Sequence, residues 1–434
     1  MAKKLWEKGI ETDAFIEAFT VGRDREFDLE LAKYDVQGTI AHITMLEKVG
    51  LLEKDELEIL VKELNTILEV IEAGDFVIEE GVEDVHSQVE MLLVSKLGDV
   101  GKKVHSGRSR NDQVLVDLKL FFRAEITELA SLIKKTFDTL LLRSEEHKNV
   151  LLPGYTHTQA AMPSSFGIWF AAYAESLVDD LVLMQSAHTI VNQNPLGSAA
   201  GYGSSFPLDR EMTSDLLGFA NPNVNVVYAQ MGRGKAEQLF SYAIATVAGT
   251  LNKLASDVCL YNSQNFKFLM LPDDLTTGSS IMPHKKNPDV FELIRAKTNL
   301  LKALPNSVAM ATTNLTSGYH RDFQILKELV FPAIQDLKDC LFITEYAMSK
   351  VSANPEILDD PKYQLIFSVE VVNELVLQGV PFRDAYKQVA EQIADGSFNP
   401  PKEVKHTHLG SIGNLGNEKI KERMEGVFDS FTQK

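Results

Sequence analysis

The sequence predicts an all-α protein built on long helices, and three features of the chain indicate this fold class. Apolar residues recur with the 3.6-residue period of an α-helix over several segments, some of which run for about 30 residues. A helix of that length is about 45 Å long, whereas the average globular helix has about 11–12 residues. Strand candidates are few, and the segment 224–228 is the best of them.

The long helical segments can be taken in chain order. The first, 51–73, carries apolar residues on one face and ends before a glycine, and 111–148 repeats the pattern over a longer stretch. The third, 163–193, opens on Pro163, a residue favoured at the first turn of a helix. Three more helical segments follow, at 235–264, 288–304 and 321–350. The last contains Pro332, which should kink or interrupt it.

Small residues predict how these helices pack. The segments 166–174 and 241–256 are rich in glycine, alanine and serine, which let helix backbones approach closely. Long helices that are apolar on more than one face need partners on more than one side. We therefore expect a central helix bundle that is completed by other subunits.

The chain is long enough for two or three domains, and its loops suggest where they divide. A glycine-containing stretch at 101–107 precedes the second long helix, and a polar, proline-containing stretch covers 354–361. The tail 397–417 is expected to be loop. These breaks predict an N-terminal helical domain (1–110), a central bundle (111–358) and a small C-terminal helical domain (359–434).

Composition excludes several classes of function. The chain has 43 Lys and Arg against 61 Asp and Glu, a net charge of −18, which argues against binding nucleic acid or an anionic membrane. No apolar run approaches the length of a membrane span, and the segment 1–7 lacks the apolar stretch of a secretory signal, so we expect a cytoplasmic protein. Cys259 and Cys340 have no metal-ligand spacing and predict two buried thiols in a reducing compartment.

Four polar, glycine-punctuated segments between the helices are candidates for chemistry: 278–289, 104–113, 153–159 and 319–324. The first combines paired serines, lysines and an asparagine, a set that suits an anion or a hydroxyl held in its deprotonated form. Arg108 and Arg110 in the second can bind carboxylates but sit unfavourably at a helix start. Composition alone leaves open that each is an ordinary surface loop or helix start, and a lone histidine such as His157 is more often structural. Phosphate-cradling, dinucleotide-binding and zinc-protease motifs do not occur in the sequence.

The polar segments resemble one family of enzymes. Residues 278–287 match the G-S-x-x-M-x-x-K-x-N signature of the fumarase/aspartase superfamily, and the segments 107–113, 153–159 and 285–289 match the argininosuccinate lyases within it. The resemblance implies an all-α fold of three domains and a homotetramer built on a twenty-helix bundle, with each active site drawn from three subunits. It also implies cleavage of argininosuccinate to arginine and fumarate, without a cofactor or metal, on a small polycarboxylate substrate.

The resemblance also implies catalytic roles. Ser279 is the expected base, with its alkoxide stabilised by Lys285 and by backbone N–H groups of the same loop. His157 is the expected acid, or the residue that organises the acid, oriented by Glu292. Thr156 lies beside it and is expected to share its role and to contact substrate.

The remaining positions are implied as substrate-binding residues. The fumarate-side carboxylates are expected to contact Asn111, Lys285 and Asn287, with Ser109 and Arg110 nearby. The arginine-side amino acid is expected to contact Tyr319, Gln324 and Lys327. Two residues are expected to line or support the pocket, Asp84 and His86.

The chain departs from the family's usual text at 6–10, 21–24, 87–89 and 229–235, and a substrate-contacting serine expected within 21–24 is absent. These departures fall on the parts that recognise the amino-acid end of the substrate. They leave open a modified argininosuccinate, or another succinylated amine such as adenylosuccinate. A non-catalytic, crystallin-like homologue is the alternative from another class. Retention of Ser279, His157, Lys285 and Asn287 argues against it.

Overall fold

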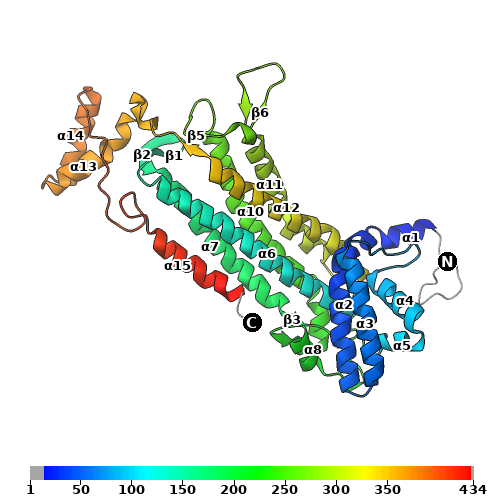
Figure 1. The fold of residues 1–434 in the computed structure, drawn as a ribbon. Coiled ribbons are helices and arrows are strands. Elements are labelled where there is room, and N and C mark those ends of the chain that lie inside the picture. The colour runs from blue at the N-terminus through cyan, green and yellow to red at the C-terminus, as the bar shows by residue number, and fades with distance from the viewer. Residues whose placement is uncertain (1–13, 432–434) are drawn as a thin grey trace.

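Five long helices form the body of the molecule in the computed structural model, which describes residues 14–431 (Figure 1). They are α6 (Arg110–Glu146), α7 (Phe166–Val191), α10 (Lys235–Tyr261), α11 (Asp289–Ala311) and α12 (Ile325–Lys350). Helix α10 packs against α7, α11 and α12, and α6 packs against α7 and α12. The predicted all-α fold with a central bundle is confirmed.

A second group of helices, all but α2 shorter than those of the bundle, lies at one end of the bundle (Figure 1). They are α1 (Ala14–Val21), α2 (Asp24–Lys48), α3 (Lys54–Glu72), α4 (Val85–Leu97), α5 (Asp99–Lys102) and η1 (Lys103–His105). Side chains from α2, α3 and α4 form a buried apolar cluster of their own, while one face of α2 joins the core of the bundle. The helix α2 therefore connects the two parts.

The opposite end of the bundle carries a β-hairpin and the C-terminal helices (Figure 1). The hairpin pairs β1 (Leu151–Thr156) with β2 (Gln159–Ser165) in antiparallel fashion. The helices α13 (Ser368–Leu377) and α14 (Phe382–Ala394) form a small apolar cluster, and α15 (Asn417–Phe428) returns to pack against α7.

Short elements complete the chain. The two-residue strands are β3 (Gln193–Asn194), β4 (Asn221–Pro222), β5 (Leu269–Met270), β6 (Thr277–Gly278), β7 (Lys286–Asn287) and β8 (Ser352–Ala353). The short helices are α8 (Arg210–Leu216), α9 (Val226–Met231), η2 (Asp273–Leu275), η3 (Arg321–Gln324), η4 (Ile357–Asp359), η5 (Pro361–Phe367) and η6 (Asp429–Phe431). The antiparallel pair β6–β7 closes a loop that projects from the bundle (Figure 1).

Several local predictions were wrong. Pro163 lies in β2 and does not start a helix; α7 begins after Ser165, whose hydroxyl accepts a hydrogen bond from the Ile168 N–H (3.2 Å). The predicted strand at 224–228 is largely the helix α9, capped by the side chain of Asn225. Of the two effects expected of Pro332, a kink or an interruption, the interruption does not occur, because α12 runs through this residue.

Three further expectations have mixed outcomes. The predicted loop at 101–107 is in part helical, because α5 and η1 cover 99–105. The tail 397–417 is mostly without helix or strand, as expected. Cys340 is buried as predicted, but Cys259 is only half-buried.

A cluster of phenylalanines fixes α2 against the bundle. Phe27 of α2 meets Phe331 of α12 edge to face, with ring centroids 5.9 Å apart, and Phe121 of α6 lies 4.4 Å from Phe331. Such aromatic pairs contribute about 0.5–1.5 kcal/mol each beyond the area that they bury. The neighbours of these rings, Asp28 on α2 and Lys327 on α12, are thereby brought face to face.

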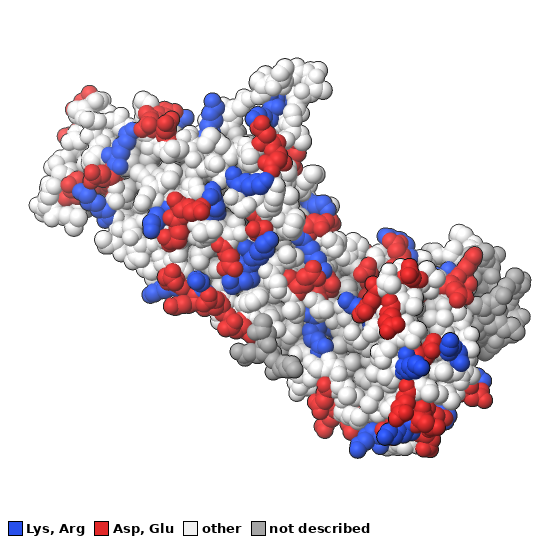
Figure 2. All heavy atoms as spheres, viewed as in Figure 1, with Lys and Arg blue, Asp and Glu red and all other residues white. Residues whose placement is uncertain are grey.

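Charge is spread over the surface. Figure 2 shows acidic and basic side chains interspersed on the visible face, so the net charge of −18 is not gathered there in one acidic patch. Within residues 14–431, the helices are too short or too polar to cross a membrane.

Candidate active site

A cavity of about 170 Å³ lies where α2, α4, α6 and α12 meet, and it gathers half of the predicted site residues. Those that line it are Asp84, His86, Arg110, Asn111, Tyr319, Gln324 and Lys327. Ser109 directly precedes two of them at the start of α6. The lining also includes Asp24, Asp28, Glu83 and Arg233, which the sequence did not single out.

The start of α6 presents polar groups to this cavity. Ser109 is the N-cap: its hydroxyl accepts from the Asn111 N–H (3.3 Å), and its own N–H donates to Asp112 Oδ1 (2.8 Å). Arg110 sits in the first turn, where its charge opposes the helix dipole. Its guanidinium pairs with Glu83 (3.2 Å) and Asp84 (3.1 Å), which compensates that repulsion. The cap therefore fixes the direction in which Arg110 and Asn111 leave the helix.

Asp84 holds the start of α4 and one side of Arg110. Its Oδ1 accepts hydrogen bonds from the Ser87 N–H (2.8 Å) and the Ser87 hydroxyl (2.6 Å), as an N-cap residue does. Burial alone would raise the pKa of Asp84. The positive charges of His86 and Arg110, together with the Ser87 hydrogen bonds, lower this pKa below its usual value. The carboxylate therefore stays ionised.

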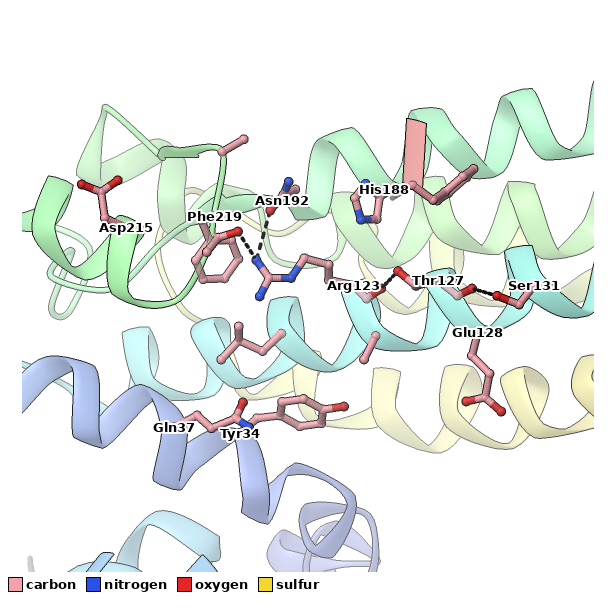
Figure 3. Close-up of a pocket in the computed structure, with 15 residues that line it drawn as sticks. Tyr34, Gln37, Arg123, Thr127, Glu128, Ser131, His188, Asn192, Asp215 and Phe219 are labelled. Carbon is pink, nitrogen blue, oxygen red and sulfur yellow. Dashed lines mark hydrogen bonds between the residues drawn. The ribbon is translucent and has the colours of Figure 1, made fainter. Parts of the chain in front are cut away.

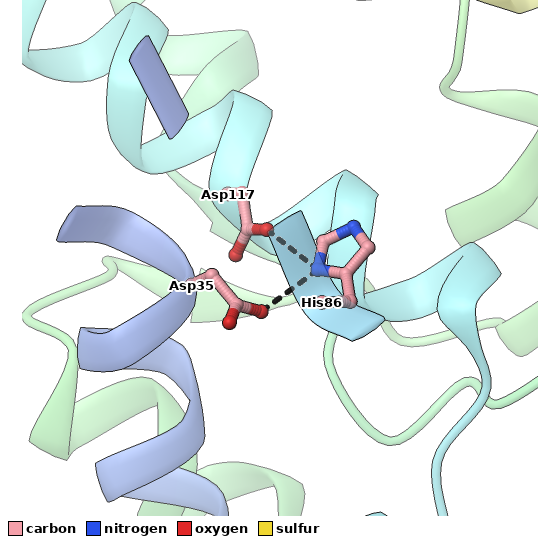
Figure 4. A group of neighbouring side chains, drawn as sticks. All are labelled: Asp35, His86 and Asp117. Carbon is pink, nitrogen blue, oxygen red and sulfur yellow. Dashed lines mark hydrogen bonds and ion pairs between the residues drawn. The ribbon is translucent and has the colours of Figure 1, made fainter. Parts of the chain in front are cut away.

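His86 lies in the wall of the cavity and is held by two buried carboxylates (Figure 4). Its Nδ1 donates to Asp35 Oδ1 (2.8 Å) and lies 3.5 Å from Asp117 Oδ2. Burial would lower the pKa of His86, but Asp35 and then Asp117 raise it to about 10. Burial and the nearby Asp35 charge raise the pKa of Asp117 well above its usual value.

These three side chains have donor atoms within 4.8 Å of one another, a spacing that also suits a metal ion. The same geometry suits an Nδ1–H that faces both carboxylates, and the raised pKa of His86 means that the ring also keeps its second proton at neutral pH. We interpret the group as an imidazolium clamped between α2 and α6. It adds a positive charge to the cavity wall next to Asp84.

Lys327 forms the floor of the cavity with two acids from α2. Its ammonium lies 2.5 Å from a carboxylate oxygen of Asp24 and of Asp28, and the lysine is buried. Burial would lower the pKa of Lys327, but these two carboxylates raise it above its usual value. Lys327 is therefore a permanent cation in the cavity.

Gln324 and Tyr319 lie beside Lys327. The Gln324 amide nitrogen donates to the carbonyls of Thr20 and Val21 (both 3.0 Å), which ties η3 to α1. Tyr319 is 42% exposed and forms the rim. Arg233, buried near Lys327, donates to Glu237 (3.0 Å) and to the Phe323 carbonyl (3.0 Å).

The tip of the hairpin β1–β2 presents a second group of predicted residues. Thr156 and Gln159 pair across a two-residue turn, and the turn residues His157 and Thr158 have φ of 52° and 58°. Positive φ at both positions is the geometry of a type I′ turn, and it is unusual for a β-branched threonine. Thr156 and His157 are both exposed, so the turn holds the imidazole away from the body of the chain.

The β6–β7 loop presents a third group, namely Ser279, Lys285 and Asn287. The Ser279 hydroxyl oxygen accepts backbone N–H groups from Ile281 (3.3 Å) and Met282 (3.1 Å). Two donors aimed at one hydroxyl oxygen favour its deprotonated form. Lys285 is exposed in the same loop, and Asn287 is half-buried in β7.

The three groups do not meet within one chain. The hairpin and the β6–β7 loop lie away from the end of the bundle that carries α2 and α4 (Figure 1). Glu292 is an exposed residue in the first turn of α11, and within residues 14–431 it makes no hydrogen bond or ion pair to His157. The cavity at Lys327 therefore contains one part of the predicted site.

A larger groove of about 960 Å³ runs along α6 and α7 near Phe219 (Figure 3). Arg123 points into it and donates to Asn192 Oδ1 (3.2 Å) and to the carbonyls of Gly218 and Leu217 (both 2.8 Å). None of its described lining residues belongs to the predicted site.

The sequence matches a family model, and the fold matches solved structures. A family model described as a lyase matches residues 7–300, more than half of the chain. A solved structure of EDDS lyase in complex with formate superposes with a TM-score of 0.78, covering 98% of this chain and 91% of that one. Its sequence identity is 20%, so this likeness concerns the fold alone. The fold and the family match define a lyase.

Relatives of higher sequence identity show which kind of lyase the chain resembles. The argininosuccinate lyase of Bacteroides thetaiotaomicron is 63% identical over 431 residues, which are 99% of this chain and 97% of the relative. That of Parabacteroides distasonis is 62% identical over 432 residues, covering 100% of this chain and 97% of the relative. The chain belongs to the argininosuccinate lyase family.

Proposed function

We propose that this chain cleaves argininosuccinate to arginine and fumarate by β-elimination, as a step of arginine biosynthesis. The observation that carries the proposal is the 63% identity to an argininosuccinate lyase over 99% of the chain. The cavity at Lys327 supports it. The cavity is small and polar, and it offers both charges that an amino-acid group requires.

Ser279 is proposed as the base that removes the proton next to a substrate carboxylate. A serine hydroxyl is a poor base unless its alkoxide is stabilised. The N–H groups of Ile281 and Met282 point at its oxygen, which supports this role. Lys285, in the same loop, is proposed to stabilise the charge that develops during the reaction, usually the largest catalytic contribution.

His157 is proposed to deliver, or to organise, the proton that the departing guanidinium takes up. Thr156 lies next to it at the exposed turn and is proposed to share this work and to contact substrate. Glu292 is proposed to orient the imidazole. Because Glu292 and His157 make no such contact within one chain, this pairing is proposed to join two subunits.

The substrate-binding residues divide by the two ends of the substrate. The fumarate-side carboxylates are proposed to bind Ser109, Arg110, Asn111, Lys285 and Asn287. The amino-acid end is proposed to bind Tyr319, Gln324 and Lys327 at the cavity described above. Asp84 and His86 support Arg110 and the cavity wall.

We further propose a homotetramer in which three subunits contribute to each site. The five helices that form the bundle in each chain, α6, α7, α10, α11 and α12, make twenty in four copies. Large apolar side chains are exposed along α10, α11 and α12, which a bundle shared with other copies would bury: Tyr242, Leu260, Leu293, Leu300, Met310 and Phe342. The three groups of site residues are also separated within one chain, and a shared bundle would bring groups from different subunits together.

The domain division 1–110, 111–358 and 359–434 is proposed on the three apolar clusters of the chain, with α15 returning to the central one. A cytoplasmic location is proposed because the reaction uses soluble metabolites.

A fumarate-release assay tests the function. The purified protein is mixed with argininosuccinate or with adenylosuccinate, and fumarate is followed by its ultraviolet absorbance. Release from argininosuccinate is expected. Release from adenylosuccinate alone would reassign the substrate, and release from neither would favour a non-catalytic homologue.

A further inference from the structure

The floor of the cavity at Lys327 carries an excess of negative charge. Asp24 and Asp28 lie one turn apart on α2, and both carboxylates contact the single ammonium of Lys327. The positive charge of Arg233 also acts on Asp24. The Arg233 guanidinium, however, is already paired with Glu237. Two carboxylates therefore share one cation.

The carboxylates of Asp24 and Asp28 differ in their exposure and in the number of partners that they already have. Asp28 is 2% exposed, and its second oxygen accepts the Val85 N–H (3.2 Å). Asp24 is 17% exposed and borders the cavity, and Lys327 is its only ion-pair partner within residues 14–431. Burial, with repulsion from Asp28, raises the pKa of Asp24 despite Lys327. Asp24 is thus the acid that can take another cationic donor.

The sequence around Asp24 points to the same end of the substrate. The segment 21–24 reads Val21-Gly22-Arg23-Asp24, where the family resemblance predicts a substrate-contacting serine. A serine is neutral, whereas Asp24 brings a full negative charge to the first turn of α2. An aspartate in place of the expected serine therefore adds a negative charge where the amino-acid end of the substrate would bind.

We propose that Asp24 binds the α-ammonium of the amino-acid end of the substrate and thereby selects substrates whose α-amine is free. This inference rests on the proposed function, which places the amino-acid end at Lys327. The Lys327 ammonium has three N–H donors. Two face Asp24 and Asp28, and the third remains for the α-carboxylate. The α-ammonium of the substrate would then contact the Asp24 carboxylate, and its α-carboxylate would contact the neighbouring Lys327 ammonium.

Acylation of the α-amine removes the charge that Asp24 requires. The amide nitrogen is neutral and has one N–H, so the carboxylate would be left without its second cation. A site that pairs a substrate group rejects analogues lacking it by up to about 10⁴–10⁵-fold, because its own polar group stays unpaired. Because Asp24 is partly exposed, we expect a smaller discrimination between the free and the acylated α-amine, about 10²-fold.

The experiment compares argininosuccinate with Nα-acetyl-argininosuccinate on the wild type, Asp24→Asn and Glu26→Gln. Glu26 is the matched control, because it is an acid in the same helical turn but pairs with Arg23 at the exposed surface. The wild type should prefer the free amine by about 10²-fold in kcat/KM. Asp24→Asn should bring this ratio close to one, chiefly through KM for argininosuccinate, and Glu26→Gln should leave it unchanged.

A binding measurement keeps the inference testable apart from turnover. By calorimetry, Asp24→Asn should weaken binding of arginine about tenfold or more, and should leave binding of Nα-acetylarginine and of fumarate unchanged. A wild type that cleaves the acetylated substrate equally well, or an Asp24→Asn variant that keeps the preference, would overturn the inference. Equal loss of all three ligands would also overturn it, because it would show general disruption. Dependence of arginine binding on Asp24, without any fumarate release, would support this inference while the proposed function failed.

Discussion

Replacing His86 with asparagine should destabilise the protein strongly. The imidazolium neutralises two carboxylates that are 2% and 1% exposed, Asp35 and Asp117. Removing one partner of a buried ion pair costs about 3–5 kcal/mol, because an uncompensated charge stays in the interior. The pKa of His86 leads to a similar free energy. A rise of this pKa from 6.5 to about 10 on folding corresponds to about 5 kcal/mol of stabilisation.

Urea unfolding at a fixed protein concentration measures this loss, since an oligomer's apparent stability depends on concentration. The double variant His86→Asn/Asp117→Asn should recover part of the loss, because it removes one of the two carboxylates. His42→Asn is the matched control. His42 is a buried histidine on the same helix as Asp35, and burial followed by the Arg108 charge lowers its pKa to about 3. The control should lose only a neutral hydrogen bond to the Ser106 carbonyl, about 1–3 kcal/mol.

The pH dependence separates the two histidines. The pKa of His86 is raised on folding, so its contribution is complete below about pH 6.5 and is lost as pH rises through about 10. The pKa of His42 is lowered, so its contribution is present above about 6.5 and is lost as pH falls toward 3. A His86→Asn loss below about 1 kcal/mol at pH 7, or one that grows with pH, would refute the reasoning. Dialysis against EDTA should change nothing, and a loss would reassign the cluster to a metal.

Three further predictions concern catalysis. Ser279→Ala should lower kcat by about 10²–10⁴-fold with an intact tetramer, and near-normal turnover would remove the serine from the mechanism. Lys285→Gln should lower kcat by about 10²–10³-fold through lost charge stabilisation, and an effect confined to KM would show that it only binds substrate. Refolding the inactive variants Ser279→Ala and Asn111→Ala together should restore measurable activity, because they lie on different groups of site residues. No recovery would contradict a site shared between subunits.

The long helices could be predicted from sequence because their apolar period is strong and uninterrupted. The β1–β2 hairpin was missed since its strands contain Pro153, Gly154 and Pro163, which are unusual in strands. Pro163 stands just before helical text and so resembles a helix start. The helix α9 was taken for a strand because three of the residues at 224–228 are β-branched.

The predicted site residues came from recognisable motifs, whereas their ion partners did not. Asp28 and Lys327 are 299 positions apart, and no local pattern pairs them. Asp35 and Asp117 are also distant from His86 in sequence, and only the packing of α2 against α6 brings them together. The packing of α2 depends on Phe27 and its aromatic neighbours, so these partners follow from tertiary structure.

The most direct test of the proposed function is quantitative cleavage of argininosuccinate by the wild-type protein. Fumarate and arginine should appear in equal amounts, without added metal or cofactor, and Ser279→Ala should abolish most of both. Fumarate from adenylosuccinate but not from argininosuccinate, or release of neither product, would contradict the proposed function.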